Sequence, residues 1–211
     1  MAISSNGVAG LKTGVCTSTT RPSGPYEGQM IYETDTDMVA IWNGTAWRYL
    51  AATTATSGSV LQVVSATKTD AQALTPTAYV YNNISGLSVS ITPKSTSSKI
   101  MIFSTVNGMS AVGANDAFLR FARDGSGIGV GDAAGSRTTV GGTLNKLSGG
   151  SMFNCSMSYM DSPASTSALT YSSQIVLSGG GTIYVNRTEV DVDINQYSRA
   201  SSSITVMEIA G

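Results

Sequence analysis

Period-two alternation of apolar and polar residues is the feature that most constrains the fold of this chain, and helical periodicity is nearly absent. β-Branched and aromatic residues are frequent in the alternating runs, and Gly, Asn, Asp, Ser or Pro separate them. The pattern predicts strands at 59–66, 78–83, 87–92, 99–107, 151–160, 169–178, 182–186 and 203–210. This number of short strands with few tight turns indicates an antiparallel β-sandwich of the jelly-roll type.

Two further segments need separate arguments. In 188–196 the polar residues Glu189, Asp191, Asp193 and Asn195 alternate with apolar ones, which predicts one more half-buried strand. Segment 115–125 has a narrow apolar stripe that Asn115 could cap as a helix. Its Asp124-Gly125 pair is equally typical of a turn between two strands, and we favour the hairpin because its neighbours are all β.

The composition limits the possible partners. Of 211 residues only 12% are charged, 31 are Ser and 25 are Thr, and the net charge is −1. No basic stripe is available for phosphate contacts, so nucleic acid is not an expected partner. Low charge also leaves little repulsion between copies of the chain, which favours an oligomer. No apolar run is long enough to span a bilayer, and the N-terminus lacks a signal-peptide pattern, so we expect a product made in a cytoplasm.

The same composition argues against an enzyme. The chain has no His, which removes the commonest general base and the commonest neutral metal ligand. Cys16 and Cys155 lie far apart in the sequence and are expected to be free thiols. Asp191 and Asp193 form a carboxylate pair, but a solvated strand face or a polar seam between subunits is the preferred interpretation. We therefore expect no catalytic residue and no cofactor.

Residues 28–50, GQMIYETDTDMVAIWNGTAWRYL, differ from the rest of the chain. The segment contains both tryptophans and an acidic cluster. Strands at 29–33, 38–43 and 45–50 are predicted, with an Asn43-Gly44 turn between the last two. Such a small meander is marginally stable alone, so cross-strand aromatic pairs and packing against another surface are expected to support it.

The aromatic and acidic residues of this meander suggest two kinds of site. Glu33, Asp35 and Asp37 lack the spacing of an EF-type calcium loop, because Val39 and Ala40 stand where an oxygen ligand and a glycine are needed. No metal is therefore expected, and a solvated acidic turn is the preferred interpretation. Exposed aromatic rings can stack on sugars, although core or subunit contact is commoner. The candidate interaction residues are Trp42, Trp47, Tyr32 and Tyr49, with the loop at 107–116 as a second place for a sugar.

The string TTRPSGPYEGQMIYETDTD followed by IWNGTAW, from Thr19 to Trp47, resembles a segment of structural proteins of tailed bacteriophages. There it stands near the N-terminus, ahead of a variable β-rich body. The body of this chain also resembles C-terminal domains of phage particle proteins, through ITPKSTSSKIMI, LRFARDG and the closing SITVMEIAG. Such bodies are similar to the trimeric jelly roll of the tumour necrosis factor type.

The resemblance implies a homotrimeric, non-enzymatic virion protein that is assembled in the host cytoplasm and displayed on the particle surface. Residues 1–50 would be an arm and meander for particle attachment, 51–58 a linker and 59–211 the jelly-roll body. The lack of a coiled-coil shaft favours a capsid decoration or cement protein whose partner is the major capsid protein or another virion protein. A short tail fibre or receptor-binding tip that recognises host surface carbohydrate is the alternative.

Overall fold

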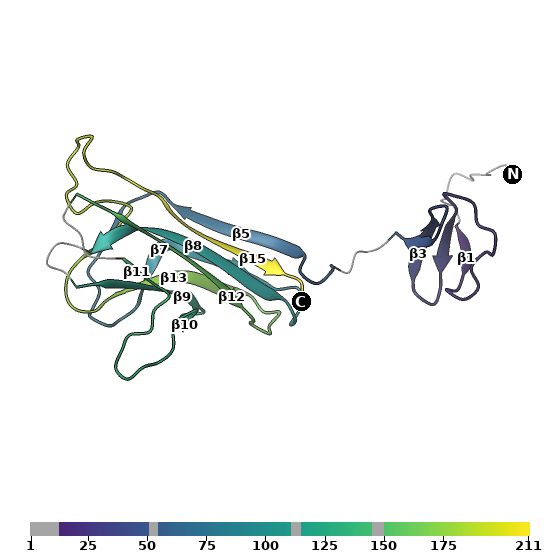
Figure 1. Cartoon of the computed structure of the whole chain (residues 1–211), viewed down its shortest axis with the longest axis horizontal. Coiled ribbons are helices and arrows are strands. Elements are labelled where there is room, and N and C mark those ends of the chain that lie inside the picture. The colour runs from purple at the N-terminus through teal and green to yellow at the C-terminus, as the bar shows by residue number, and fades with distance from the viewer. Residues whose placement is uncertain (1–12, 51–54, 111–114, 145–149) are drawn as a thin grey trace. The chain divides into compact units, whose positions relative to one another are not determined.

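The computed structural model describes residues 13–50, 55–110, 115–144 and 150–211 (Figure 1). Throughout these ranges the chain is all-β and contains no helix, as predicted. It divides into two compact units, Met1–Thr56 and Ser57–Gly211, which we call the N-terminal unit and the body. The first part of the predicted arm, 1–12, and the first half of the predicted linker, 51–54, lie outside the described residues.

The N-terminal unit is a four-stranded sheet with the order β1-β2-β3-β4. The antiparallel meander was predicted, and it consists of β2 (Met30–Glu33), β3 (Met38–Trp42) and β4 (Trp47–Tyr49). In the turn before β4, the Asn43 side-chain oxygen accepts hydrogen bonds from the Thr45 and Ala46 amides, and Gly44 adopts a φ of 90°. β1 (Gly14–Cys16) was not predicted; it pairs parallel to β2 after a crossover through residues 17–29.

The body has two antiparallel sheets. In the first, four strands lie in the order β5 (Val60–Lys68), β15 (Ser202–Ile209), β8 (Lys99–Ser110) and β12 (Phe153–Asp161). The end of β8 also pairs with β14 (Ile183–Val185), which pairs with β6 (Gln72–Leu74). In the second sheet, β7 (Asn82–Ile91) pairs with β13 (Leu169–Leu177), which pairs with β9 (Ala117–Arg123). β9 then pairs with β10 (Ser126–Ile128) and with β11 (Gly142–Leu144).

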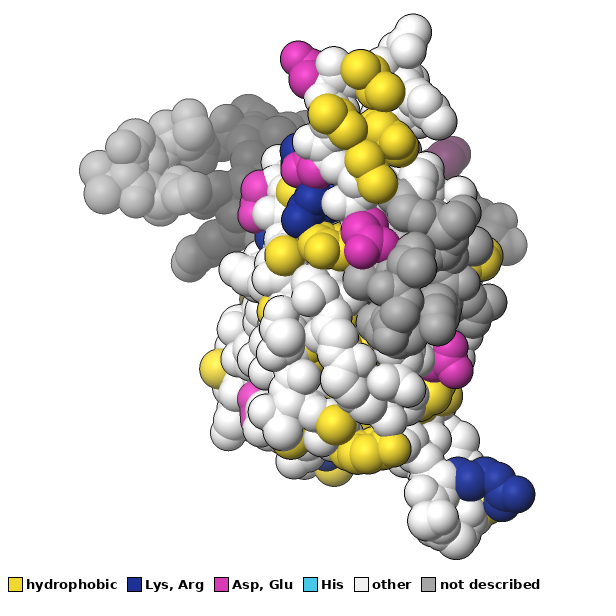
Figure 2. Space-filling model, turned by 90° about the vertical axis from the view of Figure 1, so that its left-hand side faces the viewer, with side chains coloured by type: hydrophobic (Ala, Val, Ile, Leu, Met, Phe, Trp, Pro, Cys, Tyr) yellow, Lys and Arg dark blue, Asp and Glu magenta, His cyan; other side chains and the backbone are white. Residues whose placement is uncertain are grey.

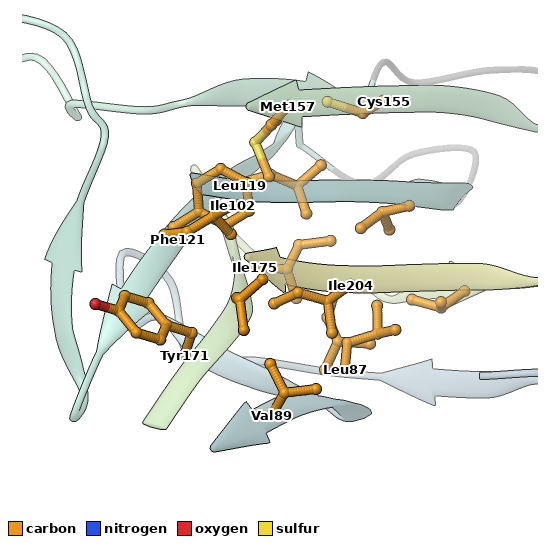
Figure 3. Packing of buried hydrophobic residues seen from close by; sticks show 14 of the residues in the cluster. Leu87, Val89, Ile102, Leu119, Phe121, Cys155, Met157, Tyr171, Ile175 and Ile204 are labelled. Atoms are coloured by element: carbon orange, nitrogen blue, oxygen red, sulfur yellow. The ribbon is translucent and has the colours of Figure 1, made fainter. Parts of the chain in front are cut away.

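The two sheets of the body meet along both edges, because β5 contacts β7 and β11 contacts β12. Within each sheet, strands that are distant in the sequence are neighbours, as in a jelly roll. Side chains from both sheets fill the space between them (Figure 3). Full burial of each large apolar side chain contributes about 1.5–3 kcal/mol. The core includes Leu87, Ile102, Leu119, Phe121, Tyr171, Ile175 and Ile204.

Two carboxylates are buried within the body, and each has several hydrogen-bond donors. Asp161 accepts from Arg123 and, at 2.7 Å, from the Tyr171 hydroxyl. Glu208 accepts from Ser98 at 2.6 Å and from the Lys94 amide at 2.6 Å. Burial acts to raise the pKa of Glu208, but these hydrogen bonds outweigh it and the pKa lies below its ordinary value.

Most of the strand predictions for the body are confirmed, including the hairpin at 115–128. Its turn is formed by Asp124 and Gly125, whose φ values of 48° and 84° are those that the favoured two-residue turn needs. The predicted gap between the strands at 78–83 and 87–92 is wrong, because β7 continues through it. Both cysteines are free, as expected; Cys155 is buried, which raises the pKa of its thiol.

The predicted strand 78–83 is wrong in its first four residues, and the strand predicted in 188–196 is wrong throughout. Residues 78–81 form a turn in which Tyr79 adopts a φ of 61° and its amide donates to the Leu177 carbonyl. The segment 189–195 is a loop, and Val192 and Ile194, which were predicted to be buried, are 55% and 50% exposed. The sequence does alternate there, but among the described residues no strand pairs with this segment.

Candidate interaction surfaces

The structure divides the four candidate aromatic residues of the N-terminal unit between the two faces of its sheet. Trp42 and Trp47 are opposite each other in register, with ring centroids 5.6 Å apart in an edge-to-face arrangement. Tyr49 shares their face, because its partner Ala40 is two residues from Trp42 on β3. Tyr32 lies on the other face, where its hydroxyl donates to the Asp37 carboxylate. These four residues therefore do not form one site.

Glu33 links the crossover segment to the sheet of the N-terminal unit. Its carboxylate is fully buried and accepts hydrogen bonds from Arg21 at 2.5 Å, Tyr49 at 2.9 Å and Thr36 at 3.1 Å. The hydrogen bond from Arg21 lowers the pKa of Glu33 against the opposing effect of burial. Interpretation of the acidic cluster as a solvated turn is therefore wrong for Glu33. Glu33 stands two residues after Ile31, so the period-two pattern places both side chains on the same face of the strand. This was the signal in the sequence that could have revealed the burial of Glu33.

The two exposed acids of the same cluster also have partners within the unit. Asp35 accepts from both the amide and the hydroxyl of Ser18, which lowers the pKa of Asp35. Asp37 accepts from Tyr32. In the described ranges, no three His, Cys, Asp or Glu side chains gather closely enough to hold a metal ion.

The middle of the outward face of the sheet β5-β15-β8-β12 is a neutral surface, and the exposed Lys99, which pairs with Ile209, lies beyond it at one end. Three rows of side chains cross the four strands in register, and none of these residues is charged. The first row is apolar throughout and Phe103 stands in the second; Val63, Phe103 and Met160 are 54%, 42% and 44% exposed. We call this surface the outer face. Its rows are Val63-Met207-Met101-Met160, Ser65-Thr205-Phe103-Ser158 and Thr67-Ser203-Thr105-Ser156.

Five large side chains on the strands of the body divide between the core and the surface. Tyr171 belongs to the core, whereas Met101 and Phe103 lie on the outer face. Tyr159 is 36% exposed. Tyr184 on β14 is half-buried beneath the Arg187 guanidinium, which lies 4.2 Å from the ring centroid.

The loop at 187–200 connects β14 to β15. Asp191 pairs with Arg199 at 2.5 Å and with Arg187 at 3.1 Å, so the predicted row of carboxylates is absent. The loop encloses a hollow of about 260 Å³ lined by Val192, Asp193, Tyr197 and neighbouring residues. Figure 2 shows apolar side chains with acidic ones beside them at this end of the body. Of the predicted sugar loop 107–116, residues 107–110 belong to β8 and 111–114 lie outside the described residues.

No family model and no curated protein matches this sequence. Among solved structures, the infectious bursal disease virus Gt strain matches with a TM-score of 0.36 and 12% identity, covering 82% of this chain and 44% of that one. The VP2 subviral particle of infectious bursal disease virus matches with a TM-score of 0.35 and 15% identity, covering 90% and 46%. The chain thus spans less than half the length of these viral proteins, and the similarity is distant.

No described segment forms a helix long and apolar enough to cross a membrane.

Proposed function

We propose that this protein is a non-enzymatic virion structural protein of a tailed bacteriophage, in which the body forms a homotrimer on the particle surface and the N-terminal unit attaches it. The preferred role is capsid decoration or cementing, with the major capsid protein or another virion protein as partner. The proposal combines the resemblance of Thr19–Trp47 to phage structural proteins with one structural observation, the neutral outer face of the body.

The outer face suits contact between copies. Residues next to a rotation axis lie close to their own copies, so a charged residue there would meet the same charge. Ser, Thr and the apolar residues of the three rows avoid this, and hydroxyls both donate and accept hydrogen bonds. Four strands about 4.8 Å apart and three rows about 6.8 Å apart cover roughly 400 Å² in projection, about half of the roughly 800 Å² per partner of a standard interface.

The mass of the full chain in solution tests the oligomer. A trimer should have three times the chain mass of 21.7 kDa. Met101→Glu on the outer face should dissociate it, whereas Val192→Glu, a matched change at an exposed residue of the 187–200 loop, should leave it intact. A monomeric wild-type chain would refute the homotrimer.

Particle incorporation tests attachment. Deleting residues 1–50 should leave a body that folds and trimerises but no longer joins particles. Hundreds of copies per wild-type particle would support a capsid decoration protein, and a few to a few tens would indicate a tail component. Incorporation of the truncated chain at the wild-type level would refute attachment through the N-terminal unit.

A receptor-binding tip is the second candidate, and the hollow in the 187–200 loop favours it. A Tyr ring beside a carboxylate is chemistry that suits a sugar, because the ring can stack on it and the carboxylate can accept from its hydroxyls. Glycan-array binding that Tyr197→Ala abolishes, together with a low copy number, would favour this role over decoration.

A further inference from the structure

The N-terminal unit has one covered and one open sheet face. Ile31, Glu33 and Ala40 on the covered face are fully buried, and Arg21 of the crossover segment binds Glu33 there. The opposite face has two mainly apolar rows, whose apolar members are exposed or half-buried. Its members, defined here as the open face, are Val15, Tyr32, Val39 and Leu50 in one row and Met30, Ile41 and Arg48 in the next.

The exposure of these residues is large for so small a unit. Val15 is 69% exposed, Leu50 52% and Met30 38%, and the other apolar members are only half-buried. A four-stranded sheet with one uncovered apolar face gains stability when that face is buried. We propose that the open face packs against the open faces of the other copies of this chain, so that the N-terminal units associate with one another as well as the bodies.

The charges of the open face favour its own copy as the occupant. Asp37, held on this face by Tyr32, lies just before β3, whereas Arg48 pairs with Ile41 near the other end of β3. The face thus has one acid and one base on opposite sides. About a rotation axis, the acid of each copy can approach the base of the next, while the apolar rows meet at the centre.

The linker at 51–58 also favours another copy of this chain as the partner of the open face, and here the inference rests on the proposed homotrimer. Residues 51–58 can span at most about 28 Å when fully extended. Once the bodies associate, the N-terminal units are therefore held at an effective concentration of ~1 mM relative to one another. Weak apolar contact is enough to join them at that concentration.

Disulfide trapping in the full-length chain tests the inference. In a Cys16→Ser background, Val39→Cys places a thiol at the centre of the open face, and Tyr26→Cys places one at a 71% exposed position away from it. The linker is the same in both variants. Under mild oxidation of the purified protein, Val39→Cys should give a cross-linked dimer severalfold faster than Tyr26→Cys. Equal rates, or no cross-link from Val39→Cys, would overturn the inference.

Charge exchange provides a second test in the same background. Asp37→Arg puts a base on both sides of the open face and should slow the Val39→Cys cross-link. Adding Arg48→Asp restores one acid and one base and should recover the rate. Failure of the double variant to recover it would contradict the proposed arrangement of charges.

The mass of the unoxidised protein separates this inference from the proposed function. A trimer without the Val39→Cys cross-link would overturn only the inference, and loss of particle binding by Val39→Lys would then assign the open face to a virion protein. A monomeric wild-type chain would overturn both the homotrimer and the inference.

Discussion

The N-terminal unit and the body are both all-β, but different interactions stabilise them. The body encloses a large apolar core between two sheets, and its buried carboxylates lie at the margins of that core. The N-terminal unit has three fully buried side chains in its described part, Ile31, Ala40 and Glu33, and one of them is charged. Small domains bury too little apolar surface to be stable by that means alone.

Polar and aromatic contacts therefore contribute a larger part of the stability of the N-terminal unit. Arg21 and Tyr49 hold Glu33, Ser18 holds Asp35, and the tryptophan rings contact across β3 and β4. The two units can be followed separately, because both tryptophans of the chain lie in the N-terminal unit. Tryptophan fluorescence reports its unfolding, and far-UV circular dichroism is dominated by the larger body.

The largest expected effect is on the body. Phe121→Ala removes a fully buried ring between the two sheets and should destabilise the body by about 3–5 kcal/mol. Circular dichroism should show an earlier unfolding transition, while the fluorescence transition stays unchanged. An equal shift of both signals would mean that the two units unfold together.

The next largest effect is expected on the stability of the N-terminal unit alone. Glu33→Gln removes the charge that pairs with Arg21 and leaves the guanidinium beside the sheet with only neutral hydrogen-bond acceptors such as the Tyr49 hydroxyl. The fluorescence melting temperature should fall by roughly 5 °C or more, with the body transition unchanged. Glu27→Gln, at an exposed position of the same segment, is the control and should have no effect. A similar fall in both variants would show that lost charge alone, rather than the buried pair, is responsible.

The difference between the units also explains what the sequence could predict. Alternation identifies β5, β8, β12, β13 and β15 because each has one side on a large core. The 189–195 loop has the same alternation, but a local pattern does not show whether a partner strand is present. Its Asp191 binds Arg187 and Arg199 instead.

The candidate interaction residues were harder to predict than the fold. The sequence predicted cross-strand aromatic pairs in the meander but not the pairing of Trp42 with Trp47, because a two-residue Asn43-Gly44 turn would place Trp42 opposite Thr45. It did not identify Arg21 as the partner of Glu33, since that contact depends on a crossover to the parallel strand β1. The outer face was also missed as a surface, because its rows combine residues from four strands that are distant in sequence.

Acidification should act on both units through different groups. Folding lowers the pKa of Glu33 and of Glu208, so each carboxylate stabilises its unit above the ordinary pKa of 4.5. This stabilisation should be lost as the pH falls below that value towards the lower folded-state pKa. Melting curves from pH 7 to 3 should show both transitions falling. Glu33→Gln should flatten only the fluorescence profile, and Glu208→Gln only the circular dichroism profile; the opposite assignment would refute this account.

The smallest effect distinguishes a structural role of the tryptophan pair from a sugar-binding one. Trp47→Leu removes the edge-to-face contact with Trp42 and should destabilise the N-terminal unit by about 1 kcal/mol in denaturant titrations followed by Trp42 fluorescence. Because a ligand stabilises the folded state that binds it, a host glycan bound at the rings would raise the wild-type midpoint but not that of Trp47→Leu. We expect no such rise, since each ring is partly covered by the other. A rise confined to the wild type would make the pair a binding site and weaken the contrast between the two units, because the aromatic residues would then serve recognition as well as stability.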